Sequence, residues 1–250
     1  MPETPTLWTE LRRFTAARVA LGRAGNGLPT AAHLDFQEAH ARARDAVHSA
    51  LDADALEAAL APLGLPALRV ASQAEDRRSY LLRPDLGRRL REEDRARLAA
   101  VAAPGAFLFV VADGLCARGV LAQAPAVLQR AVPLLRRAGL AIAPLVIAFQ
   151  ARVALGDEVG EAMGAGMVAV LIGERPGLTA TDSLGIYLTF APRRGRTDAE
   201  RNCISNIREG GMDAQAAAEK LLWLAGAALR LGATGVMLKD EQPATPLIPP

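Results

Sequence analysis

Residues 167–177 read Met-Val-Ala-Val-Leu-Ile-Gly-Glu-Arg-Pro-Gly, and this stretch decides the fold class. The apolar residues from Met167 to Ile172 show no alternation, which predicts a strand covered on both faces, as in a parallel sheet. Ligands of open α/β sheets bind beyond the carboxyl ends of such strands. The pattern therefore predicts a binding site at Glu174 and Arg175 without identifying its ligand.

Strands and helices alternate on both sides of this stretch. Further strands are predicted at 107–112, 141–149 and 185–190, and helices at 124–138, 157–164 and 213–232. This rhythm predicts an α/β fold with a Rossmann-like, mostly parallel sheet and helices on both of its faces.

The N-terminal third of the chain has a different pattern. Helical periodicity predicts helices over 8–23 and about 30–51. We therefore divide the chain into a smaller, mainly helical N-terminal domain (1–92), a Rossmann-like domain (93–238) and a proline-rich tail (239–250). The composition of the tail predicts that it is disordered.

The overall composition narrows the class of protein. The chain has 250 residues, a net charge of +2, 51% apolar and 22% charged residues, which is typical of a globular protein. So small a charge does not indicate nucleic acid or an anionic membrane as partner. The two cysteines, Cys116 and Cys203, form neither a CxxC pair nor a disulfide framework, and we expect a reducing cytoplasm.

Several catalytic motifs are missing from the sequence. It contains neither a GxGxxG fingerprint after a strand nor a Walker loop. All three histidines, His33, His40 and His48, fall in the predicted helix 30–51, so none serves a nucleophile in the α/β region. Residues 113–118 are comparable to the cobalamin-ligand motif DxHxxG, but Leu115 replaces the histidine. A histidine that reaches cobalt from this loop is excluded.

Five groups of residues, taken in order, resemble a known family. They are Thr-Glu-Leu-Arg-Arg at 9–13 with Ala-Arg-Val at 17–19 and Gly-Arg-Ala-Gly at 22–25; Tyr-Leu-Leu-Arg-Pro-Asp-Leu-Gly-Arg-Arg-Leu at 80–90; Asp-Gly-Leu at 113–115; Gly-Glu-Arg-Pro-Gly-Leu at 173–178; and Cys-Ile-Ser-Asn-Ile at 203–207 with Gly-Gly at 210–211. Each is weak alone. Together, from Thr9 to about Leu238, they resemble the small (light) subunit of ethanolamine ammonia-lyase, an adenosylcobalamin-dependent bacterial enzyme.

The resemblance implies that the enzyme has two kinds of subunit with different roles. A large TIM-barrel subunit binds ethanolamine and carries the catalytic groups, so this chain is expected to hold no catalytic residue and no metal ligand. The small subunit closes over the corrinoid, with cofactor contacts that map to Val153, Glu174 and Cys203. The implied reaction yields acetaldehyde and ammonia by radical elimination, which begins with homolysis of the cobalt–carbon bond. The resemblance also implies that the cobalamin keeps its own dimethylbenzimidazole on cobalt, which is consistent with the missing histidine at 115.

Each candidate residue also has a simpler interpretation. Glu174 and Arg175 could form only a surface pair, worth about 0–1 kcal/mol, and Cys203 could be a small buried residue. Val153 rests wholly on the resemblance, and Arg152 is a secondary candidate for a corrinoid amide or ribose. The arginines in 12–18 and 83–91 are solvated faces or partners of large-subunit carboxylates.

Two rival functions remain at this point. A self-contained small-molecule enzyme requires a catalytic constellation, and the strand-end loops contain no histidine. A regulatory or scaffold subunit on a Rossmann-like fold would bind no cofactor. Relatives from microcompartment-forming bacteria often carry a longer N-terminal extension. Only eight residues precede Thr9 here, so the sequence favours the cytoplasm over a bacterial microcompartment.

Overall fold

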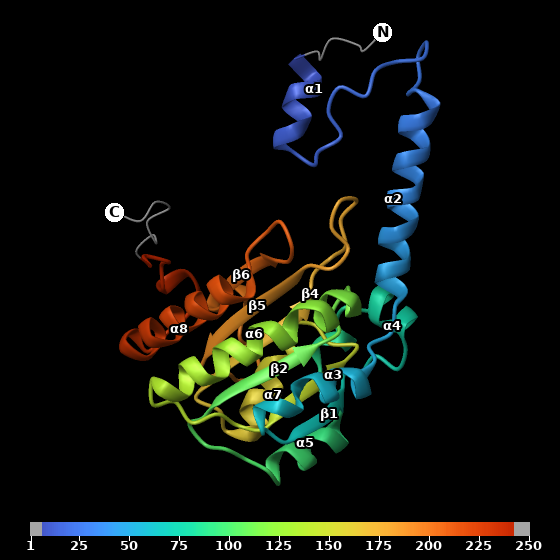
Figure 1. Cartoon of the computed structure of the whole chain (residues 1–250). Coiled ribbons are helices and arrows are strands. Elements are labelled where there is room, and N and C mark those ends of the chain that lie inside the picture. Colours follow the sequence, from blue (N-terminus) through green and yellow to red (C-terminus); the bar gives the residue numbers. More distant parts are fainter. Residues whose placement is uncertain (1–6, 243–250) are drawn as a thin grey trace, which may run out of the picture.

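A six-stranded mixed sheet forms the centre of the protein in a computed structural model that describes residues 7–242 (Figure 1). The strands, in spatial order, are β1 (Ala67–Ala71), β3 (Leu145–Phe149), β2 (Phe107–Ala112), β4 (Met167–Gly173), β5 (Leu184–Phe190) and β6 (Asn202–Ile207). The pairs β1·β3, β3·β2 and β2·β4 are parallel. The pairs β4·β5 and β5·β6 are antiparallel.

The prediction of an α/β fold is therefore confirmed, whereas a Rossmann-like sheet is not, because the sheet is mixed, with three parallel and two antiparallel strand pairs. Strand β5 runs antiparallel to its neighbour β4, which departs from the parallel pairing of β1, β3, β2 and β4. The reason lies in the connection, because residues 174–183 contain no helix. A parallel return needs a crossover of about a dozen residues or more, usually with a helix.

Helices cover both faces of the sheet. One face packs against α3 (Ala53–Leu60), α6 (Ala117–Arg137) and α8 (Ala214–Leu231). The opposite face packs against α5 (Glu92–Ala99) and α7 (Leu155–Met163). Every residue of β2 and β4 is buried, which confirms the prediction that these apolar runs are covered on both sides.

The predicted helix ends follow local chemistry. Asp213 caps α8 by accepting a hydrogen bond from the backbone N–H of Ala216, and Gly232 ends the same helix in the left-handed conformation. Gly164 ends α7 in the same way. The remaining short elements are α4 (Arg77–Leu82), η2 (Ala61–Leu63), η3 (Leu86–Arg88), η4 (Asp198–Glu200) and η5 (Gly235–Met237).

The N-terminal part is an arm that reaches away from the sheet (Figure 1). It contains α1 (Leu7–Leu11), η1 (Arg12–Phe14) and the long helix α2 (Thr30–His48). The prediction of a helix over 8–23 is wrong beyond Phe14, where Thr15 is extended and Ala20 has a positive φ of 53°. The helix predicted over about 30–51 is confirmed as α2.

The separate helical domain 1–92 is not confirmed, because β1 lies within that range and pairs with β3 at the edge of the sheet. The proposed division of the chain stays a prediction, and residues 243–250 of the predicted tail lie outside the described residues. None of the helices in residues 7–242 is long and apolar enough to cross a bilayer.

Several arginines that the sequence suggested for a partner are engaged within the chain. The pairs are Arg13–Glu10, Arg18–Asp35, Arg83–Asp85 and Arg89–Glu158. The pairs Arg13–Glu10 and Arg83–Asp85 involve exposed groups and contribute little to stability.

Candidate functional site

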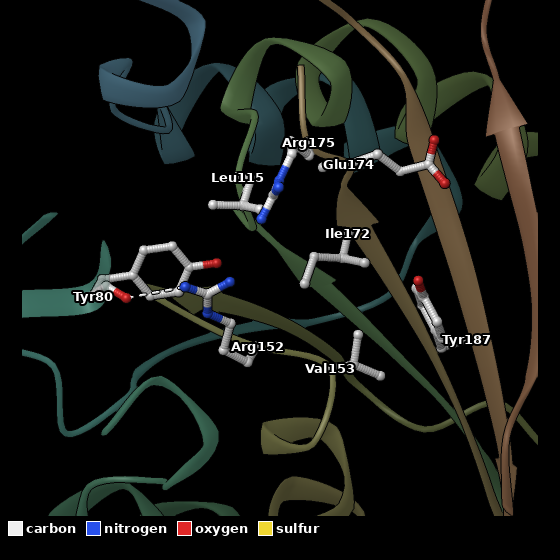
Figure 2. Close-up of a pocket in the computed structure, with 9 residues that line it drawn as sticks. Tyr80, Leu115, Arg152, Val153, Ile172, Glu174, Arg175 and Tyr187 are labelled. Atoms are coloured by element: carbon white, nitrogen blue, oxygen red, sulfur yellow. Dashed lines mark hydrogen bonds between the residues drawn. The ribbon is translucent and has the colours of Figure 1, made fainter. Parts of the chain in front are cut away.

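A cavity of about 470 Å³ opens at the carboxyl ends of the parallel strands (Figure 2). Its walls come from α4, from the loops after β2 and β3, from the end of β4 and the loop that follows it, and from the middle of β5. The lining residues are Tyr80, Leu115, Arg152, Val153, Ile172, Gly173, Glu174, Arg175 and Tyr187. This position is where the apolar run 167–172 predicted a ligand site.

Close backbone contact between the ends of β2 and β4 builds the floor of this cavity. The N–H of Leu115 donates to the carbonyl of Gly173 at 2.9 Å. A Cβ at Gly173 would lie 2.0 Å from the carbonyl oxygen of Cys116, and one at Gly114 would lie 2.4 Å from that of Gly173. Neither distance is compatible with a side chain. The motifs Asp-Gly-Leu and Gly-Glu-Arg-Pro-Gly are thus two halves of one junction.

Asp113 fixes the loop that carries Arg152 and Val153. Its buried carboxylate accepts hydrogen bonds from the backbone N–H groups of Gln150 at 2.8 Å and Ala151 at 3.1 Å, and from that of Gly114 at 2.8 Å. Burial raises the pKa of Asp113, and these three donors oppose that effect. The carboxylate therefore links the end of β2 to the turn that follows β3.

Tyr80 braces Arg152 from the side of α4. The tyrosine is fully buried and its hydroxyl donates to the carbonyl of Ala151 at 3.1 Å. The Arg152 guanidinium lies 4.2 Å from the centre of the Tyr80 ring and donates through Nη2 to the Tyr80 carbonyl at 3.1 Å. This is a cation–π arrangement with a direct hydrogen bond added. Nε of Arg152 is buried and has no hydrogen-bond partner in residues 7–242.

Glu174 connects the cavity to the antiparallel edge. Its Oε2 accepts hydrogen bonds from Oγ of Ser183 at 2.5 Å and from the backbone N–H of Asn206 at 3.2 Å. Asn206 adopts a left-handed φ of 60°. A Cβ at Gly211 would lie 2.3 Å from the Asn206 carbonyl oxygen, which explains a glycine there. Glu174 is thus held by β6 and retains Oε1 for a ligand.

Cys203 lies beside the cavity rather than in its lining. It is the cross-strand partner of Tyr187, which does line the cavity. Although the residue is exposed, desolvation around its sulfur raises the pKa of the Cys203 thiol, and the negative charge of Glu174 adds to this. The structure therefore brings Val153 and Glu174 into one cavity and places Cys203 at its rim.

The sequence as a whole matches one protein family. Residues 5–239 match the model of the ethanolamine ammonia-lyase light chain (EutC) family. The chain belongs to the ethanolamine ammonia-lyase light chain family. The "ethanolamine ammonia-lyase small subunit" of Rhodopseudomonas palustris is 54% identical over 241 residues, which cover 95% of this chain and 92% of the relative. Proteins of the same name from Bradyrhizobium diazoefficiens and Azotobacter vinelandii are 53% and 52% identical, over 96% of this chain and 92% and 90% of their own lengths.

Membership of the ethanolamine ammonia-lyase light chain family confirms the resemblance drawn from the five motifs. Two of these motifs, at 113–115 and 173–178, form the cavity junction, and the motif at 203–211 contacts its lining through Cys203, which pairs with Tyr187, and Asn206, which donates to Glu174. The roles of Val153, Glu174 and Cys203 as cofactor contacts stay predictions.

Sequence reasoning missed two aromatic residues of this light-chain cavity, Tyr80 and Tyr187. Tyr80 opens the motif 80–90, but nothing local pairs it with Arg152 more than seventy positions along the chain. Tyr187 lies on the partly alternating strand predicted at 185–190. Burial raises the pKa of both phenols, that of Tyr80 to about 12, so both hydroxyls stay neutral at physiological pH.

The chemistry of the light-chain cavity is that of a binding site. Its described lining holds one carboxylate, two guanidiniums and two phenols, and no histidine or cysteine. Within residues 7–242, no group of three or more His, Cys, Asp or Glu side chains could hold a metal ion. The arrangement suits an organic ligand with both apolar surface and polar substituents.

Proposed function

We propose that this chain is the small subunit of an adenosylcobalamin-dependent ethanolamine ammonia-lyase and holds the corrinoid against a large catalytic subunit. One observation carries the proposal. Val153 and Glu174, which come from loops after different strands, converge on a single cavity at the carboxyl ends of the sheet, with Cys203 at its rim.

The residues fit the cofactor by chemistry. A corrin has apolar faces and an edge of amide side chains. Leu115, Val153 and Ile172 supply apolar contact, while Oε1 of Glu174 is available to accept hydrogen bonds from amide N–H or ribose hydroxyl groups.

The size and openness of the cavity support a shared site. A cavity of about 470 Å³ matches a drug-sized molecule, and a corrinoid is larger than that. The chain would therefore grip one side of the cofactor, and a TIM-barrel large subunit would close the other. This arrangement also accounts for the lack of a catalytic constellation in the described lining.

The work of this chain is to bind, orient and exclude water. Adenosylcobalamin held here would supply radical chemistry for the elimination of ethanolamine on the large subunit. Glu174, tied to Ser183 and Asn206, fixes the orientation of the corrin edge. The closed interface protects reactive species from solvent. Assembly of the two subunits in the cytoplasm is part of this proposal.

Reconstitution tests the proposal. The purified chain is expected to have no ethanolamine ammonia-lyase activity, and co-expression with its large subunit is expected to give activity that depends on added adenosylcobalamin. Turnover by the isolated chain would contradict the proposal in favour of a self-contained enzyme.

A double variant separates cofactor binding from a scaffold role. In the complex, Glu174→Ala with Cys203→Ala is expected to lose cobalamin while the subunits stay associated on gel filtration. Unchanged cobalamin affinity in that complex would favour a regulatory or scaffold subunit that binds no cofactor.

A further inference from the structure

The cavity contains two guanidiniums that have no anionic partner. Neither Arg152 nor Arg175 joins an ion pair within residues 7–242, where pairs such as Arg77–Asp113 and Arg201–Asp157 do form. Glu174 is the carboxylate of the described lining, and Ser183 and Asn206 already bind its Oε2. In Figure 2 its carboxylate points away from Arg175, toward the side of Tyr187. One side of the cavity therefore carries net positive charge.

Arg152 is held in place before any ligand arrives. Its backbone N–H donates to the Gly87 carbonyl at 2.8 Å, and its side chain passes so close to Gly87 that a Cβ there would lie 3.0 Å from Arg152 Cγ. The Tyr80 ring and carbonyl fix the guanidinium. A guanidinium fixed in this way loses less entropy when it binds a ligand.

No carboxylate of residues 7–242 forms an ion pair with Arg152. The pKa of Tyr80 is raised to about 12 by burial, so the phenol beside Arg152 is uncharged at physiological pH. The buried Nε has no partner in the described residues. An unsatisfied buried donor is costly in a folded protein and calls for an acceptor. Because Nε is enclosed, a ligand oxygen would instead meet Nη1, which makes no hydrogen bond within residues 7–242 and is not fully buried.

We propose that Arg152 and Arg175 form an anion subsite that binds a phosphodiester. Because this inference rests on the proposed function, the group is the phosphodiester in the nucleotide tail of cobalamin. Guanidinium forks match the geometry of phosphate oxygens. The neighbouring apolar wall of Leu115, Val153 and Ile172 fits an organic ligand that carries the phosphate, rather than free phosphate.

Two corrinoids test the subsite in the intact complex with the large subunit. Cyanocobalamin contains the nucleotide tail, and dicyanocobinamide lacks it together with the phosphodiester. The wild-type complex is expected to bind cyanocobalamin more tightly by equilibrium dialysis. Arg152→Gln and Arg175→Gln are each expected to lower cyanocobalamin affinity roughly tenfold or more and to leave cobinamide affinity unchanged.

The variants are chosen so that misfolding does not mimic the result. Arg175 is exposed, so Arg175→Gln is not expected to disturb the fold. Arg77→Gln is the matched control, because Arg77 lies 4.7 Å from the same Tyr80 ring but outside the cavity lining. It is expected to lower the affinity for both corrinoids by the same factor or for neither. Inorganic phosphate is expected to compete with cyanocobalamin in the wild type and not in Arg175→Gln.

The remaining outcomes of these binding experiments distinguish failure of the anion subsite from failure of the proposed function. Equal losses for cyanocobalamin and cobinamide in both cavity variants would overturn the subsite and leave the proposed function standing. Inorganic phosphate that binds without displacing cyanocobalamin would assign the two arginines to a free anion, and would also overturn it. If the wild-type complex binds neither corrinoid, the proposed function itself fails.

Discussion

The two halves of the sheet are built by different means. In the parallel half, β2 and β4 are joined by direct backbone contact at Gly114 and Gly173, and every residue of these two strands is buried. In the antiparallel half, β6 is an edge strand with several exposed residues, and side chains such as Arg201 and Glu174 tie it to the rest. The cavity lies where the halves meet. The side of the cavity formed by β2 and β4 is therefore fixed by backbone packing, whereas the position of the side formed by β5 and β6 depends on polar side-chain contacts.

The largest effect is expected in the parallel half, at Gly173→Ala. The new methyl group would meet the Cys116 carbonyl oxygen at 2.0 Å and the Asp113 carbonyl oxygen at 2.7 Å, and both are backbone atoms that cannot easily move aside. We expect a loss of about 3 kcal/mol or more in the free energy of unfolding, or an insoluble protein. Denaturant unfolding of the purified chain measures it.

Gly177→Ala is the matched control within the same motif. Its Cβ would meet only the Ala180 carbonyl, at 3.6 Å, which is an ordinary contact. Similar stability in the two variants would contradict the account of the β2–β4 junction.

The antiparallel half is expected to depend on the ion pair between Arg201 and Asp157. Both side chains are almost fully buried, and Nη1 of Arg201 lies 2.5 Å from Oδ1 of Asp157 on α7. Arg201→Met leaves a buried carboxylate without its partner, which costs about 3–5 kcal/mol. The double variant Asp157→Asn with Arg201→Met is expected to recover part of that loss in urea unfolding. A double variant no more stable than the single one would contradict the pairing.

Variants of Glu174 test whether the cavity between the two halves binds cobalamin. In the complex, Glu174→Ala is expected to weaken cobalamin binding about tenfold, because a charged acceptor for the ligand is lost. Ser183→Ala keeps the carboxylate and removes only the 2.5 Å hydrogen bond that orients it, so a smaller loss is expected. Equal affinities in Glu174→Ala and wild type, measured by equilibrium dialysis, would remove Glu174 from the site.

The smallest effect concerns the reactivity of Cys203. Because its thiol pKa lies above the ordinary value, less thiolate is present at pH 8 than in a free thiol. Alkylation by iodoacetamide is expected to be slower than that of glutathione at pH 8 and to rise steadily at higher pH. Cys203→Ser should abolish native-state labelling, since Cys116 is fully buried. A rate that levels off below pH 8 would contradict the raised pKa.

The parallel core was predictable because its strands are continuous apolar runs. Residues 107–112 and 167–172 indicate two-sided burial whatever their neighbours are, and the structure confirms both. The antiparallel edge was not predicted. Residues 202–207 carry Asn and Ser at exposed edge positions, which hides the strand pattern. The direction of β5 follows from a connection without a helix, and the Pro- and Gly-containing segment 174–183 carries that information in its sequence.

The site was predictable only in part, for a related reason. Glu174 follows a recognisable strand, and its position at the strand end indicates a ligand site without further knowledge. Tyr80 and Arg152 contact each other only in the folded protein, where the Asp113 carboxylate fixes the loop that carries Arg152. Val153 has no local signal, and its placement came from the family resemblance alone.

A structure of the complex with its large subunit and bound cobalamin tests the central claim most directly. The account predicts the corrinoid at the subunit interface, with one edge in van der Waals contact with Val153 and within hydrogen-bond distance of Oε1 of Glu174. A corrinoid enclosed by the large subunit alone, with this cavity facing solvent or filled by a side chain of the partner, would contradict it.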